Sequence, residues 1–259
     1  NVTYEPTQTE LQNGSTTLTI RALSGNSCGE VTKDVVINFR ELAVVNAGAD
    51  ITLCETETSV ALSGMVSGDG YNGKWSTNSF GSFSPSANDL NAEYIFGAND
   101  VLIGNAKLIL TSTNNGACPP VTDTLNVFLN KQAVVNAGVD QHVCNSTTTI
   151  ELSGTASHAE SITWTTSGDG VFLPSDSELT SEYIIGNNDA ANAEVELILT
   201  AEPLAGCAPV KDTLRVFITT PLKAAFDYGV ACVNSEVQFF DQTEVFSGNI
   251  ASWRWNFGD

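Results

Sequence analysis

Six cysteines are the residues with the clearest capacity for covalent chemistry in this sequence, and four of them recur at a fixed interval. Cys54 and Cys144 each end a copy of one segment, VNAGADITLC and VNAGVDQHVC, and 144 − 54 gives a period of 90 residues. Cys118 recurs as Cys207, at 207 − 118 = 89 residues. Equivalent modules should carry equivalent disulfides, so the spacing predicts two bridges that each stay within one repeat, Cys54–Cys118 and Cys144–Cys207.

Two cysteines, Cys28 and Cys232, have no mate in this scheme. We expect Cys28 to pair upstream of the sequence and Cys232 downstream of it, and the alternative is that both are free thiols. Zinc is a poor explanation, because no C-x-x-C occurs and the two histidines, His142 and His158, stand apart. Neither histidine recurs in the sister module, so we expect both at the surface. No G-x-S-x-G or H-E-x-x-H motif occurs either, and the sequence therefore predicts no enzyme.

Aspartates in repeated turns are candidate oxygen ligands for Ca²⁺, which is the one cofactor that the sequence suggests. Asp50 and Asp140 follow the repeated N-A-G segment, and Asp100 and Asp189 lie in repeated G-x-N-D loops. A calcium ion at the start of each module would stiffen the connection between modules. The competing interpretation is a turn, in which Gly supplies the positive φ angle and Asp accepts hydrogen bonds from backbone N–H groups.

Two other repeated features also have a functional and a structural interpretation. Thr124 and Thr213 lie in D-T-L tripeptides, which resemble the Asp-Thr-aliphatic O-glycosylation site of one phylum of gliding bacteria. The alternative is that threonine simply suits a β-strand. Trp75 and Trp164 are predicted to anchor the cores of their modules, whereas exposed rings would suit stacking on sugars.

The chain between these landmarks consists of short apolar alternations broken by Gly, Asn, Asp and Pro, which is typical of strands and turns. No helical pattern of about 10 residues or more is present. Roughly seven strands in about 90 residues predict an all-β fold, with tandem antiparallel β-sandwiches of immunoglobulin-like type in an elongated array. We expect each disulfide to join the entry segment of a module to a hairpin turn near one end of the sandwich.

The repeat predicts four parts along the chain. Residues 1–42 match the C-terminal part of a repeat, residues 43–132 and 133–220 are complete repeats, and residues 221–259 follow another pattern. We therefore expect a section of a longer polypeptide. The linkers are only a few residues long, which favours a semi-rigid rod over freely jointed modules.

The bulk composition restricts the partners. The 259 residues carry a net charge of −20, and 42% of them are hydrophobic, which is enough for packed cores. Such acidity disfavours binding to nucleic acid or to anionic membrane surfaces. No run of about 20 apolar residues is present, so we expect no insertion into a membrane. No signal peptide begins at Asn1, but the paired cysteines predict an extracellular or cell-surface location.

The last part of the chain resembles the beginning of a PKD (polycystic kidney disease) domain. The resemblance covers residues 225–227, the stretch VQFFDQT at 237–243 and the stretch WRWNFGD at 253–259, which matches that family's W-x-W-x-F-G-D signature. It implies a further β-sandwich, of which this sequence contains the N-terminal part.

The V-N-A-G-x-D-x-x-x-C modules followed by a PKD-like module resemble the repeat region of very large cell-surface adhesins of gliding bacteria, which the type 9 secretion system exports. The resemblance implies a structural stalk that presents an adhesive tip. Its partners would be neighbouring repeats, the secretion or motility machinery, or a surface polysaccharide. One alternative is a set of carbohydrate-binding or spacer modules in a secreted polysaccharide-degrading enzyme, which coplanar exposed aromatic rings would favour. Another is a calcium-dependent interaction rod.

Overall fold

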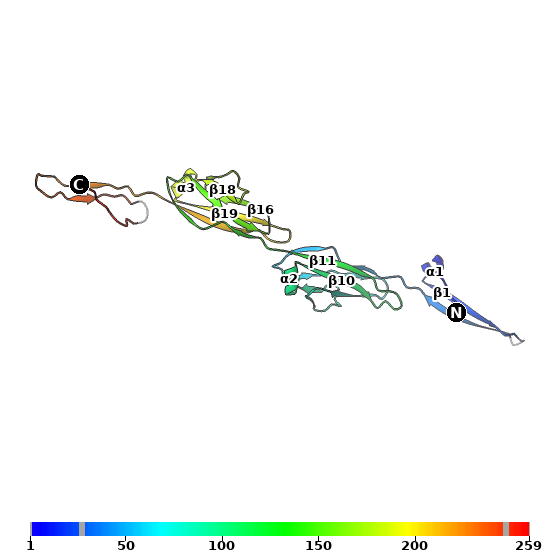
Figure 1. The fold of residues 1–259 in the computed structure, drawn as a ribbon. Helices are drawn as coiled ribbons and strands as arrows, with labels where there is room; N and C mark the ends of the chain where they lie inside the picture. The colour runs from blue at the N-terminus through cyan, green and yellow to red at the C-terminus, as the bar shows by residue number, and fades with distance from the viewer. Residues whose placement is uncertain (1, 26–28, 246–248, 259) are drawn as a thin grey trace. The chain divides into compact units, whose positions relative to one another are not determined.

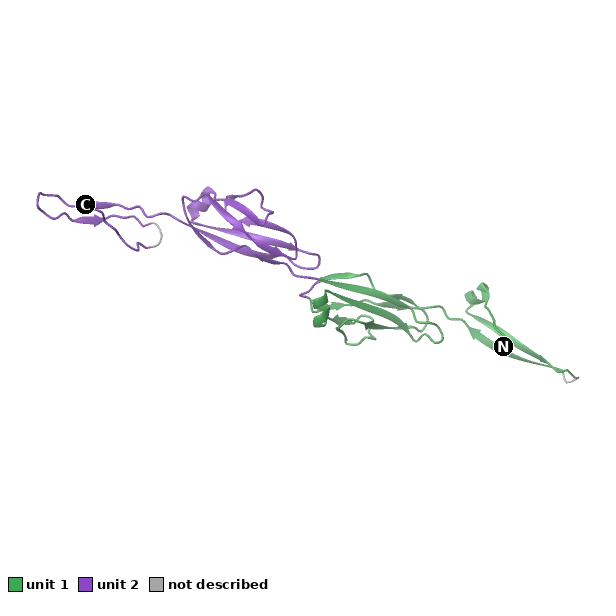
Figure 2. Ribbon diagram, viewed as in Figure 1, with its two compact units in different colours: residues 1–53, 57–129 green, residues 54–56, 130–259 purple. Residues whose placement is uncertain are grey.

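The computed structural model describes residues 2–25, 29–245 and 249–258 (Figure 1). β-Strands predominate in it, which confirms the predicted all-β class. The chain divides into two compact units, one of residues 1–53 and 57–129 and the other of residues 54–56 and 130–259 (Figure 2). The short segment 54–56 therefore belongs to the second unit, although it lies in the first complete repeat of the sequence.

The first complete repeat is a sandwich of two main sheets. A four-stranded sheet has the order β4-β11-β10-β7, a three-stranded sheet has the order β5-β9-β8, and β3 pairs with β6. The strands are β3 (Val44–Asn46), β4 (Ile51–Cys54), β5 (Ser59–Ala61), β6 (Met65–Ser67), β7 (Asn72–Thr77), β8 (Ser82–Ser84), β9 (Glu93–Ile95), β10 (Asn105–Thr113) and β11 (Thr122–Asn130). Alternate residues of β10 and β11 are buried, as a strand with one core face requires. The largest buried side chains are Trp75, Tyr94, Leu108, Leu110 and Leu125.

The second complete repeat has the same arrangement. Its sheets have the orders β13-β20-β19-β16, β14-β18-β17 and β12-β15. The strands are β12 (Val134–Asn136), β13 (Gln141–Cys144), β14 (Thr149–Ser153), β15 (Thr155–Ser157), β16 (Ala159–Thr166), β17 (Val171–Leu173), β18 (Thr180–Ile184), β19 (Glu194–Pro203) and β20 (Val210–Thr219). Its largest buried side chains are Trp164, Tyr183, Ile150, Leu152, Leu197, Leu199 and Leu214. Both modules are immunoglobulin-like sandwiches.

In the second module, the two strands of the entry segment pair in different directions. β12 pairs antiparallel with β15, but β13 pairs in parallel with the last strand, β20. β12 belongs to the small β12-β15 sheet and β13 is the edge strand of the four-stranded sheet, so the entry segment contributes to two sheets. Cys144, the last residue of β13, therefore lies beside the end of β20, where it is the register partner of Thr219.

The structure contains three helices among its described residues, and each has six residues. They are α1 (Gln8–Asn13), α2 (Ala98–Ile103) and α3 (Asn187–Asn192). The absence of a helical pattern of about 10 residues is thus consistent with the structure. None of the helices in the described ranges reaches the length and hydropathy that crossing a bilayer requires.

The N-terminal part, residues 1–42, forms α1 and a hairpin of β1 (Ser15–Leu23) and β2 (Glu30–Asn38). Leu18 is paired with Val35, as Leu108 is paired with Leu125 one period later. Val35 is 56% exposed, whereas Leu125 is 1% exposed, because no second sheet among the described residues packs against the hairpin. The structure thus keeps the register of the repeat in a segment without a sandwich core. Cys28 lies outside the described residues.

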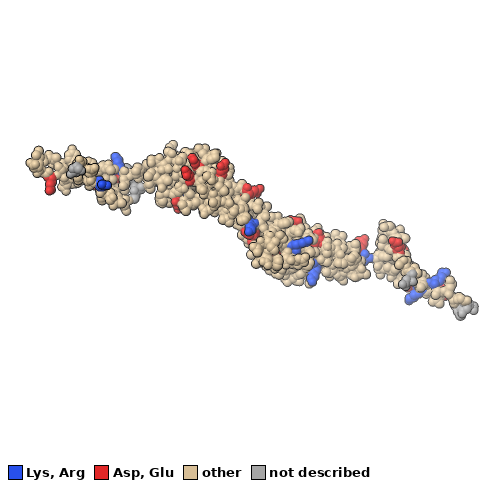
Figure 3. All heavy atoms as spheres, in the orientation of Figure 1, with Lys and Arg blue, Asp and Glu red and all other residues tan. Residues whose placement is uncertain are grey.

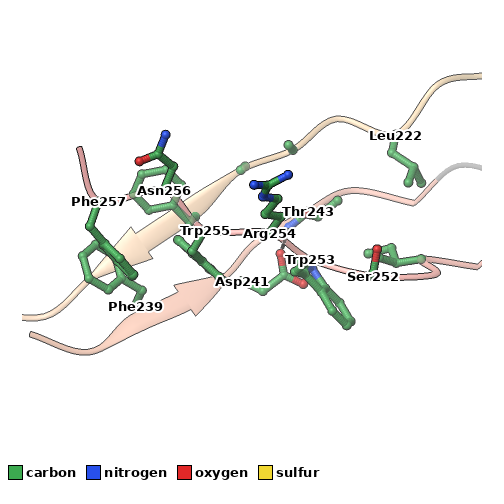
Figure 4. A pocket seen from close by; sticks show the side chains of 14 residues that line it. Leu222, Phe239, Asp241, Thr243, Ser252, Trp253, Arg254, Trp255, Asn256 and Phe257 are labelled. Atoms are coloured by element: carbon green, nitrogen blue, oxygen red, sulfur yellow. Dashed lines mark hydrogen bonds between the residues drawn. The ribbon is translucent and has the colours of Figure 1, made fainter. Parts of the chain in front are cut away.

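The C-terminal part forms a hairpin of β21 (Phe226–Tyr228) and β22 (Phe239–Asp241), with residues 249–258 beside it (Figure 4). The ring of Trp255 lies 5.3 Å from that of Phe226 and 5.4 Å from that of Phe239. These side chains line a hollow of about 440 Å³. Asp259, the last residue of the PKD-like signature, lies outside the described residues.

Acidic side chains are spread over the visible face in Figure 3 and do not form a single patch. The sequence contains 30 Asp and Glu residues against 10 Lys and Arg residues. The surface charge is therefore a property of the whole chain and identifies no particular site.

Candidate functional site

The repeated V-N-A-G segment forms a turn whose geometry explains its residue types. The side-chain Oδ1 of Asn46 accepts a hydrogen bond from the N–H of Gly48 at 2.8 Å, and Gly48 has φ 97°. Asn136 and Gly138 repeat the arrangement at 2.8 Å, with φ 105° for the glycine. Asparagine closes the turn, and glycine adopts the left-handed backbone without steric cost. The segment thus forms a turn with glycine at positive φ, but asparagine accepts the turn N–H group where the sequence had suggested aspartate.

A reciprocal pair of carboxylates fastens this turn to the last strand of the module. Asp123 of β11 accepts a hydrogen bond from the N–H of Ala47 at 2.8 Å, and Asp50 accepts one from the N–H of Asn126 at 2.8 Å. The N–H groups of Ala47 and then Thr124 hold the pKa of the Asp123 carboxyl below its ordinary value. The two repeated segments, V-N-A-G-x-D and D-T-L, are thus joined by these two hydrogen bonds, and we call this pair of contacts the clamp.

The second module has the same clamp, with Asp212 bonded to the N–H of Ala137 at 2.7 Å and Asp140 bonded to the N–H of Arg215 at 2.9 Å. Asp123 and Asp212 are the first residues of the two D-T-L tripeptides, and the sequence analysis assigned them no role of their own. The signal was available, because two polar motifs with the same period can contact each other in every module. The neighbouring threonines, Thr124 and Thr213, lie on β11 and β20, where Thr124 is half-buried and Thr213 is exposed. Their glycosylation stays a prediction.

Asp100 is a fully buried carboxylate at the start of α2, with 0% exposure. Its Oδ1 accepts a hydrogen bond from the N–H of Phe80 at 2.8 Å. Its Oδ2 accepts from the hydroxyl of Tyr94 at 2.9 Å and from the N–H of Gly97 at 3.0 Å. Three donors therefore satisfy a group that would otherwise be costly to bury.

Asp189 repeats this network in the second module. It accepts hydrogen bonds from the hydroxyl of Tyr183 at 2.7 Å, from the N–H of Gly186 at 2.9 Å and from the N–H of Asp169 at 3.1 Å. Burial, together with the hydrogen bond to Asp189, raises the pKa of Tyr183 to about 12. Burial likewise raises the pKa of Tyr94. Both tyrosines therefore stay protonated and donate to their carboxylates.

These contacts do not fit a calcium site. The oxygens of Asp100 and Asp189 face N–H and O–H donors, whose positive ends would oppose a cation. Asp50 and Asp140 accept backbone N–H groups of the last strands. Across the described ranges, no three Asp, Glu, His or Cys side chains gather as ligands. Calcium binding stays a prediction without a ligand set in this structure.

Trp75 and Trp164 anchor the cores, as predicted. They are 0% and 1% exposed, and their ring N–H groups donate to the carbonyls of Leu90 at 3.2 Å and Glu178 at 3.1 Å. Rings enclosed in this way cannot stack on a sugar. The histidines, His142 and His158, are both exposed, as expected.

The predicted disulfides Cys54–Cys118 and Cys144–Cys207 are wrong. The structure joins Cys54 to Cys207, across 153 residues of sequence and with their Cα atoms 4.6 Å apart. The physical reason lies in the periodicity itself. Because Cys118 and Cys207 are equivalent, a bridge within one repeat and a bridge to the next repeat obey the same symmetry. Among the described residues, Cys118, Cys144 and Cys232 are free.

Polar groups of the linker between the repeats surround this bridge, all within the second unit. The carbonyl of Asn130 accepts a hydrogen bond from the N–H of Glu55 at 2.8 Å and lies 3.5 Å from Sγ of Cys207. The side-chain amide of Asn130 donates to the carbonyl of Ala205 at 2.8 Å. Gln132 continues the contact and donates to the carbonyl of Ala208 at 2.9 Å. The bridge, linker and turn thus form one bonded cluster, which the sequence interpretation missed.

The solved structures that this chain resembles share little of its sequence. No family model matches the chain, and no curated protein matches it. An I-band fragment of titin is 12% identical, over 80% of this chain and 75% of that chain, with a TM-score of 0.43. Drosophila N-cadherin EC1-4 is 13% identical over 78% of this chain and 57% of its own length, with a TM-score of 0.38. Mouse cadherin-23 EC22-24 is 12% identical, over 82% and 77%, with a TM-score of 0.34.

Proposed function

We propose that this chain is a structural stalk segment of a large secreted, cell-surface adhesin, in which covalently linked sandwiches hold an adhesive tip away from the cell. The observation that carries the proposal is the Cys54–Cys207 bridge, which connects one repeat to the next. A disulfide between modules transmits tension from module to module, whereas one within a module would only protect that module. Its presence also favours an oxidising compartment outside the cytoplasm.

The interior of each complete module supports the same role. The buried carboxylates of Asp100 and Asp189 accept internal hydrogen bonds, and the rings of Trp75 and Trp164 are enclosed. Each module buries its own cluster of apolar residues, so each can fold as a unit in an array. We include in this proposal export by the type 9 secretion system and attachment to the motility machinery or to a surface polysaccharide. These parts rest on the resemblance of the repeats to those of adhesins.

Stretching single molecules tests the mechanical role. With the bridge intact, the segment between the two cysteines, which are 153 positions apart in sequence, cannot lengthen under load; fully extended it would span roughly 500 Å. We expect force–extension curves of the oxidised chain to lack this length and curves of the reduced chain to gain it in two unfolding steps. A chain that releases the full length while oxidised would contradict a load-bearing bridge.

The alternative function, carbohydrate binding, has one observation in its favour. Trp253, Trp255 and Phe257 are 56%, 41% and 68% exposed beside the hollow in Figure 4. Exposed aromatic rings of this kind suit the apolar faces of sugars. Binding to a panel of acidic and neutral polysaccharides that weakens in Trp255→Ala, and is unchanged in the exposed-residue control Val230→Ala, would favour this alternative.

A further inference from the structure

The bridge defines two kinds of cysteine. Cys54 is the last residue of β4, and Cys144 is the last residue of β13. We call these two residues the entry cysteines. We call Cys118 and Cys207, which lie in the turn between the last two strands, the turn cysteines. The bond that forms, Cys54–Cys207, joins the entry cysteine of one repeat to the turn cysteine of the following repeat. One cysteine of each kind is left over.

The free turn cysteine, Cys118, is held in the same way as the bonded one. Its N–H donates to the carbonyl of Asn115 at 3.0 Å, as the N–H of Cys207 donates to that of Leu204 at 3.3 Å. Its Sγ lies 3.8 Å from the carbonyl of Arg40, and Sγ of Cys207 lies 3.5 Å from the carbonyl of Asn130. Arg40 precedes Asn130 by one period, 130 − 40 = 90. The turn and the linker of this half of the junction are therefore already in place.

The free entry cysteine, Cys144, supplies the other half. It ends β13 as Cys54 ends β4, and the next residue is fastened to the last strand in both cases. Asn145 donates its N–H to the carbonyl of Thr219 at 2.9 Å, and Glu55 donates its N–H to that of Asn130 at 2.8 Å. The two residues differ in solvent exposure: the bonded Cys54 is 2% exposed, whereas the free Cys144 is exposed.

We propose that Cys118 and Cys144 are the two halves of further inter-repeat bridges of the Cys54–Cys207 type. Cys144 bonds to the turn cysteine of another V-N-A-G module, and Cys118 bonds to the entry cysteine of one. The partner is a module of the same chemistry, whether it belongs to a longer form of this chain or to a second copy. The observation behind the proposal is that one entry cysteine and one turn cysteine form the bridge, whereas the other entry cysteine, Cys144, and the other turn cysteine, Cys118, are free.

The bond forms by two thiol–disulfide exchanges with a small disulfide such as oxidised glutathione. The thiolate of Cys144 attacks one sulfur of the oxidant, which forms a mixed disulfide and releases one glutathione thiolate. The thiolate of the partner's turn cysteine then attacks the Cys144 sulfur and releases the second glutathione. The two protein thiols lose two protons and two electrons in total, and the oxidant gains them as two thiols.

Oxidation of the full chain in a glutathione buffer tests the proposal with a second copy as partner. The background carries Cys28→Ser and Cys232→Ser, so that only the four repeat cysteines remain. We expect covalent oligomers whose cross-linked peptides contain Cys144 of one chain and Cys118 of another, with Cys54–Cys207 retained. Cys144→Ser alone and Cys118→Ser alone should each stay monomeric, whereas a mixture of the two should give dimers and nothing larger.

The native protein from its source distinguishes the two kinds of partner. A Cys144 peptide cross-linked to the Cys118 peptide in a covalent dimer or larger oligomer identifies a second copy, and one cross-linked to a different V-N-A-G repeat identifies a longer chain. Three results would overturn the proposal: a Cys118–Cys144 bond within one chain, a Cys144–Cys232 bond in the wild-type chain, or dimers from either single variant alone.

Discussion

The linkers before the two complete repeats dock on equivalent turns by different means. At the first, the guanidinium of Arg40 lies 3.9 Å over the ring of Tyr71 and donates to the carbonyls of Asp69 and Asn114, at 3.0 and 2.8 Å. At the second, Asn130 and Gln132 donate side-chain amides to the turn, and the Cys54–Cys207 bond is added. The comparison teaches that the docking of linker on turn does not need the disulfide. The disulfide is present only at the second linker, where Cys54 lies beside the turn that contains Cys207.

The largest expected effect comes from removing a core tryptophan, and it tests whether the two modules unfold independently of each other. Trp164→Ala should lower the stability of the second module by about 3–5 kcal/mol, because a large buried ring leaves a cavity. Trp75→Ala should do the same to the first module. Calorimetry should show one transition moving while the other stays. If both transitions move together in either variant, the modules are coupled and the junctions cannot be compared as separate units.

The clamp between the entry turn and the last strand should have the next largest effect. Asp123→Ala leaves the buried N–H of Ala47 without its acceptor, so we expect a loss of about 1–3 kcal/mol in the first module. Asp212→Ala should match it in the second module. Denaturant unfolding measures both, and Asp89→Ala, on an exposed loop, is the control. A loss confined to one module would show that the two entry segments are not equivalent.

The bridge itself should change local opening more than global stability. Cys54→Ser removes the bond beside Lys131, and we expect tryptic cleavage after Lys131 to accelerate about tenfold, equivalent to roughly 1.4 kcal/mol of local stability. Cleavage after Arg40, whose linker has no bridge, should keep its rate. Cys118→Ser is the matched control and should change neither. Equal acceleration at Lys131 and Arg40 in Cys54→Ser would contradict a bridge that restrains one linker only.

The smallest effect concerns pH. The pKa of Asp123 is lowered in the folded state, chiefly by the N–H of Ala47. Its contribution to stability is therefore fully present above the ordinary Asp value of about 3.9 and is lost as pH falls through the lower folded pKa. We expect the melting temperature of the first module to fall below about pH 4, and Asp123→Asn to flatten that decline. An identical decline in wild type and variant would remove this carboxylate as the cause.

Much of the local structure could be predicted because its causes lie within a few residues. The V-N-A-G turn follows from an asparagine that bonds two residues ahead and a glycine at positive φ. The enclosed Trp75 and the alternating burial of β10 follow from the apolar pattern. Asp100 was harder to interpret, because a carboxylate in a polar loop has the same sequence signature whether it binds a cation or caps a short helix. Only the positions of Tyr94 and Phe80 decide this.

The sequence by itself determined the period, the module boundaries that we expect from it, the strand pattern and the residues that anchor each core. The tertiary structure alone decided the partner of Cys54, the partner of Asp123 and the parallel pairing of β13 with β20. The reason is that a repeated sequence is unchanged by a shift of one period. Any contact between equivalent positions can then be made within a repeat or to its neighbour, and only the path of the chain in space selects between them.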